Sequence, residues 1–243
     1  METKKFTGFV LKVTDYKEKD KLLTMFTLEE GLITVNLRGV KNAKAKLKSF
    51  GLPFCFAEWI VVVMGHNYIV TTATMIDSFF DITQDIDKYV AGSVILNLDR
   101  ELLRFPDNSS SELFVSSLKA LRAVCYQDIE PKVVLCKLFF EVLEMNGFSF
   151  FNTNCSICGE AYEGSGFLNV DDGNITCREC RSLNSIELSN GVMSFLKLLK
   201  DDLDSFQSVQ IDAGVVLNTL KVLKLNIEKR LPLNINLKQL NIN

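Results

Sequence analysis

Four cysteines in two pairs have the spacing of a metal site. Cys155 and Cys158 form the first pair, Cys177 and Cys180 form the second, and eighteen residues separate the pairs. A two-residue spacer lets a tight turn offer two sulfur atoms to one Zn²⁺, and four thiolates complete a tetrahedron. Because four protein ligands leave no open position on the metal, the pattern predicts one structural Zn²⁺ per chain, and core cysteines or two disulfides are the alternative.

A basic segment, residues 38–48, is the second stretch that indicates chemistry. It has five positive charges and no negative one: Arg38, Lys41, Lys44, Lys46 and Lys48. The last three alternate with small or apolar residues, so they can project together, neutralise phosphates and release counterions. We therefore predict a nucleic-acid contact here, and a solvated loop is the alternative interpretation.

A shorter segment upstream could extend this basic surface. Lys17, Lys19 and Lys21 alternate with Glu18 and Asp20, so a plain polar turn is an equal alternative. Nearby aromatic residues could stack on bases. Tyr16 is such a candidate, whereas Phe50 is expected to pack in the core.

Residues for catalysis are scarce. His66 is the only histidine and lies in a Gly-His-Asn turn, and no G-x4-G-K-[ST] phosphate loop occurs. The carboxylate clusters at 171–172 and 201–204 have the composition of turns and solvated surface. The sequence thus predicts a protein that is not an enzyme.

Composition bounds the class of protein. The chain has 243 residues, of which 47% are hydrophobic, so a sizeable core is expected. No run of 18 apolar residues and no signal peptide is visible, and seven cysteines suit a reducing compartment, so we expect a cytoplasmic protein without a membrane partner. The net charge is −3, but residues 1–80 carry eleven Lys and Arg against eight Asp and Glu.

Five strand-like runs organise the N-terminal third of the chain. They cover residues 6–14, 22–28, 32–37, 54–64 and 68–80, and the basic segment lies in the long connection between the third and fourth. This arrangement favours a five-stranded OB-fold barrel over residues 1–81. An SH3-like barrel is the structural alternative.

From about residue 84 the apolar period changes from two to 3.6, which indicates helices. We expect a helical domain over residues 82–243, with a zinc-binding insertion at about 151–183. One helix begins at Pro131, is apolar nearly all round and ends near Gly147, so it belongs in the middle of a bundle. Further helices are expected at about 189–204 and 213–230. The fold class is thus α+β.

The order of barrel, basic connection, helices and cysteine quartet resembles the RecO family of recombination mediators. The resemblance covers nearly the whole chain. It rests on the runs Leu37–Lys41, Lys137–Phe148, Cys155–Gly159 and Gly173–Cys180. The family's zinc-bearing branch has the four cysteines, whereas the acidic charge balance of this chain departs from its basic relatives.

The resemblance implies a function. RecO proteins bind single- and double-stranded DNA, anneal complementary strands, and with RecR help load RecA onto DNA coated by the single-strand-binding protein SSB. The family's barrel cations and zinc ligands correspond here to the basic segment and the four cysteines. SSB is engaged through its acidic C-terminal tail, for which Lys119, Arg122 and Lys132 are candidates in or near the helices.

Two other functions are alternatives to this one. A protein-interaction scaffold would use the barrel and the zinc unit to dock partners, with DNA contact only incidental. A zinc hydrolase would need a metal-bound water, and four cysteine ligands argue against one.

Overall fold

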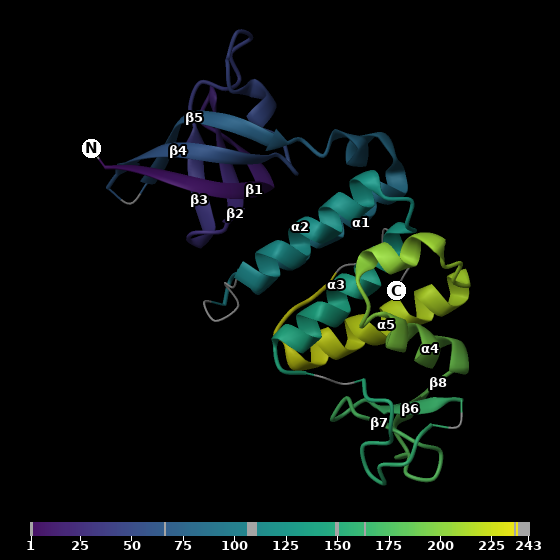
Figure 1. Cartoon of the computed structure of the whole chain (residues 1–243). Coiled ribbons are helices and arrows are strands. Elements are labelled where there is room, and N and C mark those ends of the chain that lie inside the picture. The colour runs from purple at the N-terminus through teal and green to yellow at the C-terminus, as the bar shows by residue number, and fades with distance from the viewer. Residues whose placement is uncertain are drawn as a thin grey trace. The chain divides into compact units, whose positions relative to one another are not determined.

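The computed structural model describes residues 2–65, 67–105, 111–148, 151–162, 164–235 and 237. The chain forms two compact units, Met1–Tyr126 and Gln127–Asn243, each of which is considered by itself (Figure 1). The first unit contains the barrel and two helices, so it extends beyond the domain expected over residues 1–81. The domain boundary expected after residue 81 remains a prediction.

The first unit begins with a closed five-stranded barrel (Figure 1). Its strands are β1 (Thr3–Tyr16), β2 (Asp20–Thr27), β3 (Gly31–Leu37), β4 (Phe56–Met64) and β5 (Asn67–Asp77). The strand order is β1-β2-β3-β5-β4, with β1 paired to both β2 and β4 and β3 parallel to β5. This is the OB-fold arrangement, so the predicted fold class is confirmed and the SH3-like alternative is set aside.

Alternation of apolar and polar residues explains the barrel. On β3, Ile33, Val35 and Leu37 are buried, and the residues between them face outward. Trp59 on β4 is fully buried in the barrel core, and its indole N–H donates to the Gly8 carbonyl at 3.0 Å. A buried Trp needs such an acceptor, because an unpaired N–H would cost free energy.

The fifth strand was expected to end at Phe80, but β5 ends at Asp77. The short helix η2 (Phe80–Gln84) follows and leads into two longer helices of the first unit. They are α1 (Ile86–Leu102) and α2 (Ser111–Tyr126). The Asp85 carboxylate caps α1 by accepting from the backbone N–H groups of Asp87 and Lys88. Between the helices, the buried Ser117 hydroxyl donates to a carboxyl oxygen of the buried Asp99 at 2.6 Å. This polar pair therefore lies in the contact between two apolar faces.

The second unit is built around α3 (Pro131–Met145), which packs on α5 (Ala213–Arg230). Pro131 opens α3, and Gly147, at a φ of 77°, closes its end by donating to the Glu144 carbonyl at 2.9 Å. Both predicted ends of this helix are confirmed. Lys137 is nearly buried, and its ammonium donates to the Leu199 carbonyl and pairs with Glu141 at 3.1 Å.

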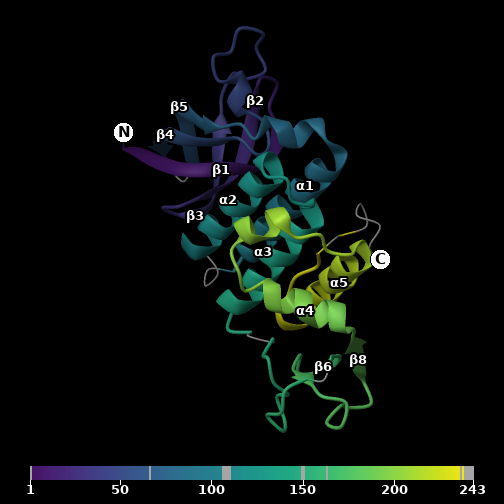
Figure 2. The ribbon, with the colours of Figure 1, turned by 45° about the vertical axis from the view of Figure 1, so that its right-hand side comes forward.

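A small sheet precedes the last helices of the second unit. Its strands are β6 (Gly166–Asn169), β7 (Ile175–Thr176) and β8 (Ser185–Leu188), in the order β7-β6-β8. β8 leads into α4 (Asn190–Leu198), as both views of the ribbon show (Figures 1 and 2).

The helix predicted over 189–204 is shorter than expected. It ends at Leu198, and a separate helix η4 (Leu203–Ser208) follows. The carboxylates of Asp201 and Asp202 suit the start of a new helix better than the end of an old one, because the end carries partial negative charge. Among the described residues, no helix is long and apolar enough to cross a membrane. His66 lies outside the described residues.

Candidate functional site

The four cysteines of the quartet are gathered at one point of the second unit. Their sulfur atoms all lie within 4.8 Å of one another, and the Sγ atoms of Cys158 and Cys177 are 3.9 Å apart. Cys155 is buried and the other three are partly or fully exposed. Four thiol sulfurs in so small a volume can hold a metal ion.

Local turns place these sulfur atoms. Gly159, at a φ of 76°, donates its N–H to the Cys155 carbonyl at 3.0 Å and closes the first turn. The Cys177 N–H donates to the Cys155 sulfur at 3.2 Å, which ties the second pair to the first. The chain between the pairs forms the β6–β7 hairpin. This hairpin brings the two cysteine pairs together, although eighteen residues separate them in the sequence.

The thiols do not share one ionisation behaviour. Burial raises the pKa of Cys155, but backbone N–H groups of Cys158, Cys177 and Ile157 together outweigh it and lower the pKa to about 6. The hydrogen bond with Cys177, helped by burial, raises the pKa of Cys180 to about 12. One anionic sulfur thus raises the pKa of its neighbours, and a cation bound among them would remove that conflict.

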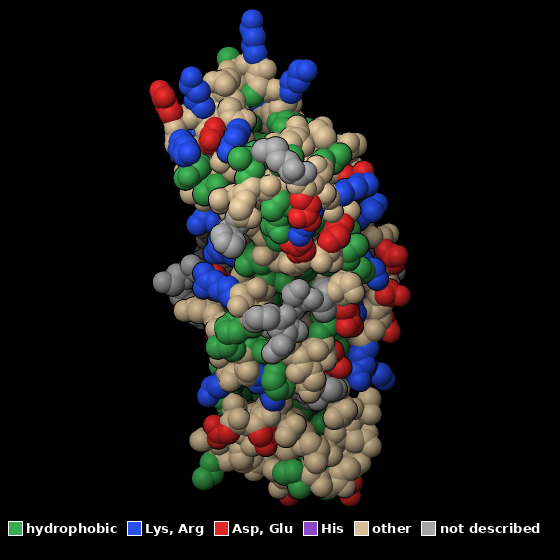
Figure 3. Space-filling view, turned by 90° about the vertical axis from the view of Figure 1, so that its left-hand side faces the viewer, with side chains coloured by type: hydrophobic (Ala, Val, Ile, Leu, Met, Phe, Trp, Pro, Cys, Tyr) green, Lys and Arg blue, Asp and Glu red, His purple; other side chains and the backbone are tan. Residues whose placement is uncertain are grey.

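The two basic segments of the barrel lie together, although sixteen residues lie between Lys21 and Arg38 along the chain. The Lys41 N–H donates to the Lys19 carbonyl at 3.1 Å, and the Lys41 ammonium lies 3.0 Å from an Asp15 carboxylate oxygen. The Gly39 N–H donates to the Asp20 carboxylate at 2.8 Å. These contacts join the β1–β2 turn to the β3–β4 connection, and Lys and Arg side chains gather at that end of the barrel, at the top of Figure 3.

Not all eight predicted cations are equally available. Lys41 is exposed but paired with Asp15, and Lys21 is half-buried with its ammonium donating to the Gly51 carbonyl at 3.1 Å. The other six are exposed and make no ion pair among the described residues: Lys17, Lys19, Arg38, Lys44, Lys46 and Lys48. Lys17 and Arg38 line a groove. Lys44, Lys46 and Lys48 lie in the β3–β4 connection.

This groove lies on the outer face of the barrel between the β1–β2 and β4–β5 turns. It encloses about 440 Å³ and is lined by Tyr16, Lys17, Leu22, Thr34, Asn36, Arg38, Met64, Asn67, Tyr68 and Ile69. The ligand face of an OB-fold lies over strands 2 and 3, beside these same two turns. Sequence reasoning had singled out Tyr16, Lys17 and Arg38 but missed the rest, which only strand pairing brings to one face. Phe50 packs edge-on against Trp59 at 5.8 Å, as expected of a core residue.

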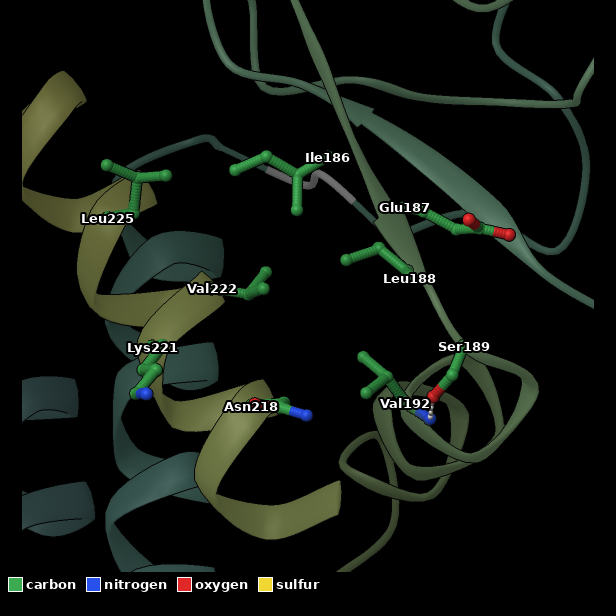
Figure 4. Close-up of a pocket in the computed structure, with 9 residues that line it drawn as sticks. All are labelled: Ile186, Glu187, Leu188, Ser189, Val192, Asn218, Lys221, Val222 and Leu225. Atoms are coloured by element: carbon green, nitrogen blue, oxygen red, sulfur yellow. Dashed lines mark hydrogen bonds between the residues drawn. The ribbon is translucent and has the colours of Figure 1, made fainter. Parts of the chain in front are cut away.

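A second groove, of about 390 Å³, lies in the second unit between β8, α4 and α5 (Figure 4). Ile186 and Leu188 point from β8 toward α5, and Glu187 points to the other side of the strand, as alternation requires. Val192 and Val222 complete an apolar lining. Lys221 and Asn218 add polar groups from α5. Nothing in the sequence periodicity had indicated this groove.

The candidate partner-binding residues are spread over both units. Lys119 and Arg122 are exposed on α2, in the first unit. Lys132 is half-buried on α3, in the second, where it pairs with Glu130 at 3.2 Å. Their role in holding an acidic tail remains a prediction.

Comparison with known families matches nearly the whole chain. The family description "Recombination protein O N terminal" matches residues 1–79, and "Recombination protein O C terminal" matches residues 83–239. The first match spans the barrel. The second spans the helices and the cysteine quartet.

Individual relatives agree with this assignment. A protein of Clostridium novyi is 25% identical over 226 residues, which cover 93% of this chain and 88% of the relative. Proteins of Caldicellulosiruptor bescii and Caldicellulosiruptor saccharolyticus are 26% and 27% identical, over 88% and 93% of both partners. All three bear the name DNA repair protein RecO. The chain therefore belongs to the RecO family of DNA repair proteins.

Proposed function

We propose that the protein is a DNA-repair mediator, not an enzyme, that binds single- and double-stranded DNA and anneals complementary strands. The observation that carries the proposal is the joining of the two basic segments at one end of an OB-fold barrel. Six exposed cations there can neutralise phosphates of two strands at once. Base pairing then supplies the free energy of annealing, so no catalytic residue is needed.

Family membership supports the proposal of a wider role. In this proposal the protein acts in the bacterial cytosol with RecR and helps load RecA onto SSB-coated DNA. The partner SSB would be held through its acidic C-terminal tail, which needs an apolar cleft and a cation. The groove of Figure 4 offers both, with Leu188 and Val222 in its lining and Lys221 beside them, so we propose it ahead of Lys119, Arg122 and Lys132.

The metal of the cysteine quartet is proposed to be one Zn²⁺ with a structural role. In a tetrahedron with Zn–S bonds of about 2.3 Å, the sulfur atoms lie about 3.8 Å apart. The 3.9 Å between Cys158 and Cys177 fits this spacing, and the 4.8 Å limit for the set requires only a small contraction. Four thiolates are also the donor set that Zn²⁺ prefers, and they leave no position for a catalytic water.

The central test is DNA binding by a charge-reversal variant. Lys44, Lys46 and Lys48 changed together to Glu should lose most affinity for single-stranded and duplex DNA. The slope of log K against log salt should become less steep by about 2, since each single-strand phosphate contact contributes about 0.7. A matched control reverses three exposed lysines of the second unit: Lys197, Lys200 and Lys229. If the two folded variants bind DNA with equal affinity, Lys44, Lys46 and Lys48 do not form the DNA-binding site.

A strand-annealing assay on SSB-coated DNA, with and without RecR, tests the mediator role itself. The same charge-reversal variant should anneal poorly, whereas a Lys221→Glu variant should anneal bare strands normally and fail when SSB covers them. A protein that binds RecR and SSB but no bare DNA would instead be a scaffold. The net charge of −3 is the observation that favours that second function.

A further inference from the structure

The groove on the barrel, described above, has an outward-facing floor that pairing of three strands defines. Asn36 on β3 lies directly opposite Leu22 on β2 and Ile69 on β5. Its neighbours along the strand, Val35 and Leu37, are buried, so Asn36 belongs to the outer face. One amide thus lies between two apolar side chains at the bottom of the groove.

This amide has unused hydrogen-bonding capacity. The Asn36 side-chain oxygen is buried and accepts no hydrogen bond. A buried acceptor without a partner costs free energy, and a donor that reaches it recovers that cost. The terminal torsion of asparagine is soft and nearly two-fold, so the amide can turn its oxygen or its N–H₂ group toward a ligand.

The wall beside this floor is aromatic and cationic. Tyr16 is 37% exposed at the end of β1, and the Lys17 ammonium lies 5.1 Å from the centre of its ring. Met64, the last residue of β4, also lines the groove and is 42% exposed. Flat apolar surface beside a positive charge suits a planar ring attached to an anion.

Among the described residues that line the groove, the charged ones are both positive. They are Lys17 and Arg38, and Arg38 directly follows the end of β3, two residues beyond Asn36. The groove therefore combines a stacking ring, a hydrogen-bonding amide and two phosphate-compatible cations. A nucleotide with a free base has the three complementary features. A base in a duplex has its faces stacked and its edge paired, so it cannot use the first two.

We propose that the groove takes one unpaired base of a single-stranded nucleic acid, stacked on Tyr16 and hydrogen-bonded to Asn36, with adjacent phosphates at Lys17 and Arg38. The inference rests on the proposed function, and adds a division of labour to it. The lysines of the β3–β4 connection hold phosphates of either single strands or duplexes. The groove holds a base, and so gives preference to single strands.

The test measures binding of three labelled probes with equal numbers of phosphates: oligothymidylate, the same backbone without bases, and a duplex. The intact chain should bind oligothymidylate more tightly than the abasic strand. Tyr16→Ala should weaken oligothymidylate binding about tenfold, within the range that one base–aromatic stack supplies, and leave the other two probes unchanged. Tyr16→Phe keeps the ring and should bind all three probes like the intact chain.

Asn36→Leu is the second variant, because leucine packs between Leu22 and Ile69 without an amide. It should also weaken only oligothymidylate binding. Fluorescence of the buried Trp59 reports whether each variant has a folded barrel. The inference is overturned if folded Tyr16→Ala and Asn36→Leu variants bind all three probes normally, or weaken all three equally. Failure of the intact chain to bind any probe would instead remove the proposed function.

Discussion

The Lys41 ammonium lies 3.0 Å from a carboxylate oxygen of Asp15, and this ion pair joins the β3–β4 connection to the end of β1. The pair is exposed, so we expect it to contribute no more than about 1 kcal/mol to stability. Its larger effect is on charge, because it occupies a lysine that the sequence had assigned to DNA.

Removing that carboxylate should therefore improve DNA binding. In Asp15→Asn, Lys41 is free to contact a phosphate, so affinity should rise and the salt slope should steepen by about 0.7 for single strands. The matched control is Glu18→Gln, which removes the same charge from the neighbouring turn, where Glu18 has no ion pair among the described residues. If the two variants gain affinity equally, net charge explains the effect and the ion pair does not.

The backbone conformation of Lys17 is expected to lower the stability of the barrel, while its charge contributes to DNA binding. Its φ of 50° lies in the left-handed region, where a side chain other than that of glycine is strained. Lys17→Gly should raise the free energy of unfolding by about 0.5–1 kcal/mol, although the gain is reduced by the flexibility of glycine in the unfolded chain. The same variant should bind single-stranded DNA more weakly. Urea unfolding and oligonucleotide titration measure the two effects, and a variant less stable than the parent would contradict the strain argument.

Asp99 should make the first unit less stable as pH rises. Burial raises the pKa of this carboxyl to about 8, and the Ser117 hydrogen bond opposes the shift only in part. Below the unfolded-state value of 3.8 both states hold the proton, and the contribution to stability is at its maximum. Between pH 3.8 and about pH 8 the folded state keeps the proton and the unfolded state loses it. The free energy of unfolding therefore falls as pH rises and levels off above about pH 8.

Asp99→Asn tests this sign. The variant should resemble the parent near pH 4 and exceed it in stability near pH 8, by on the order of a few kcal/mol. Trp59, the single tryptophan, lies in the same compact unit and reports its unfolding by fluorescence. Asp87→Asn removes an exposed carboxylate from the same helix and is the matched control. Parallel pH profiles for Asp99→Asn and its parent would refute the prediction.

Removal of the metal should unfold a part of the second unit and leave the barrel intact. With a strong chelator, or in Cys158→Ser, amide exchange should accelerate across β6, β7 and β8, because bonds such as Cys177 N–H to the Cys155 sulfur lose their anchor. The Trp59 unfolding transition should not move. Metal analysis should find one zinc per chain before chelation. Loss of barrel stability on chelation would contradict the purely local role.

The spacing of the cysteines and the apolar periods of the strands and helices predicted the metal site and the fold class from the sequence alone. C-x2-C spacing restricts sulfur geometry locally, and alternation on β3 or the all-apolar face of α3 states which residues must be buried. The five-stranded barrel was accessible for that reason, and the family was accessible from the resemblance of particular runs such as Leu37–Lys41 and Cys155–Gly159. The end of α4 was not, because a short helical turn competes with a long helix by small differences in capping.

Tertiary structure decided which of the predicted groups are available. Lys21 and Lys41 look like Lys46 in the sequence, but the fold gives one a backbone carbonyl and the other a carboxylate. Asn36 had no sequence signal, since its importance comes from strand register with Leu22 and Ile69. Pairing between strands is a long-range property. Local pattern can name the cations of this barrel, but only the closed sheet places a ring, an amide and two charges in one groove.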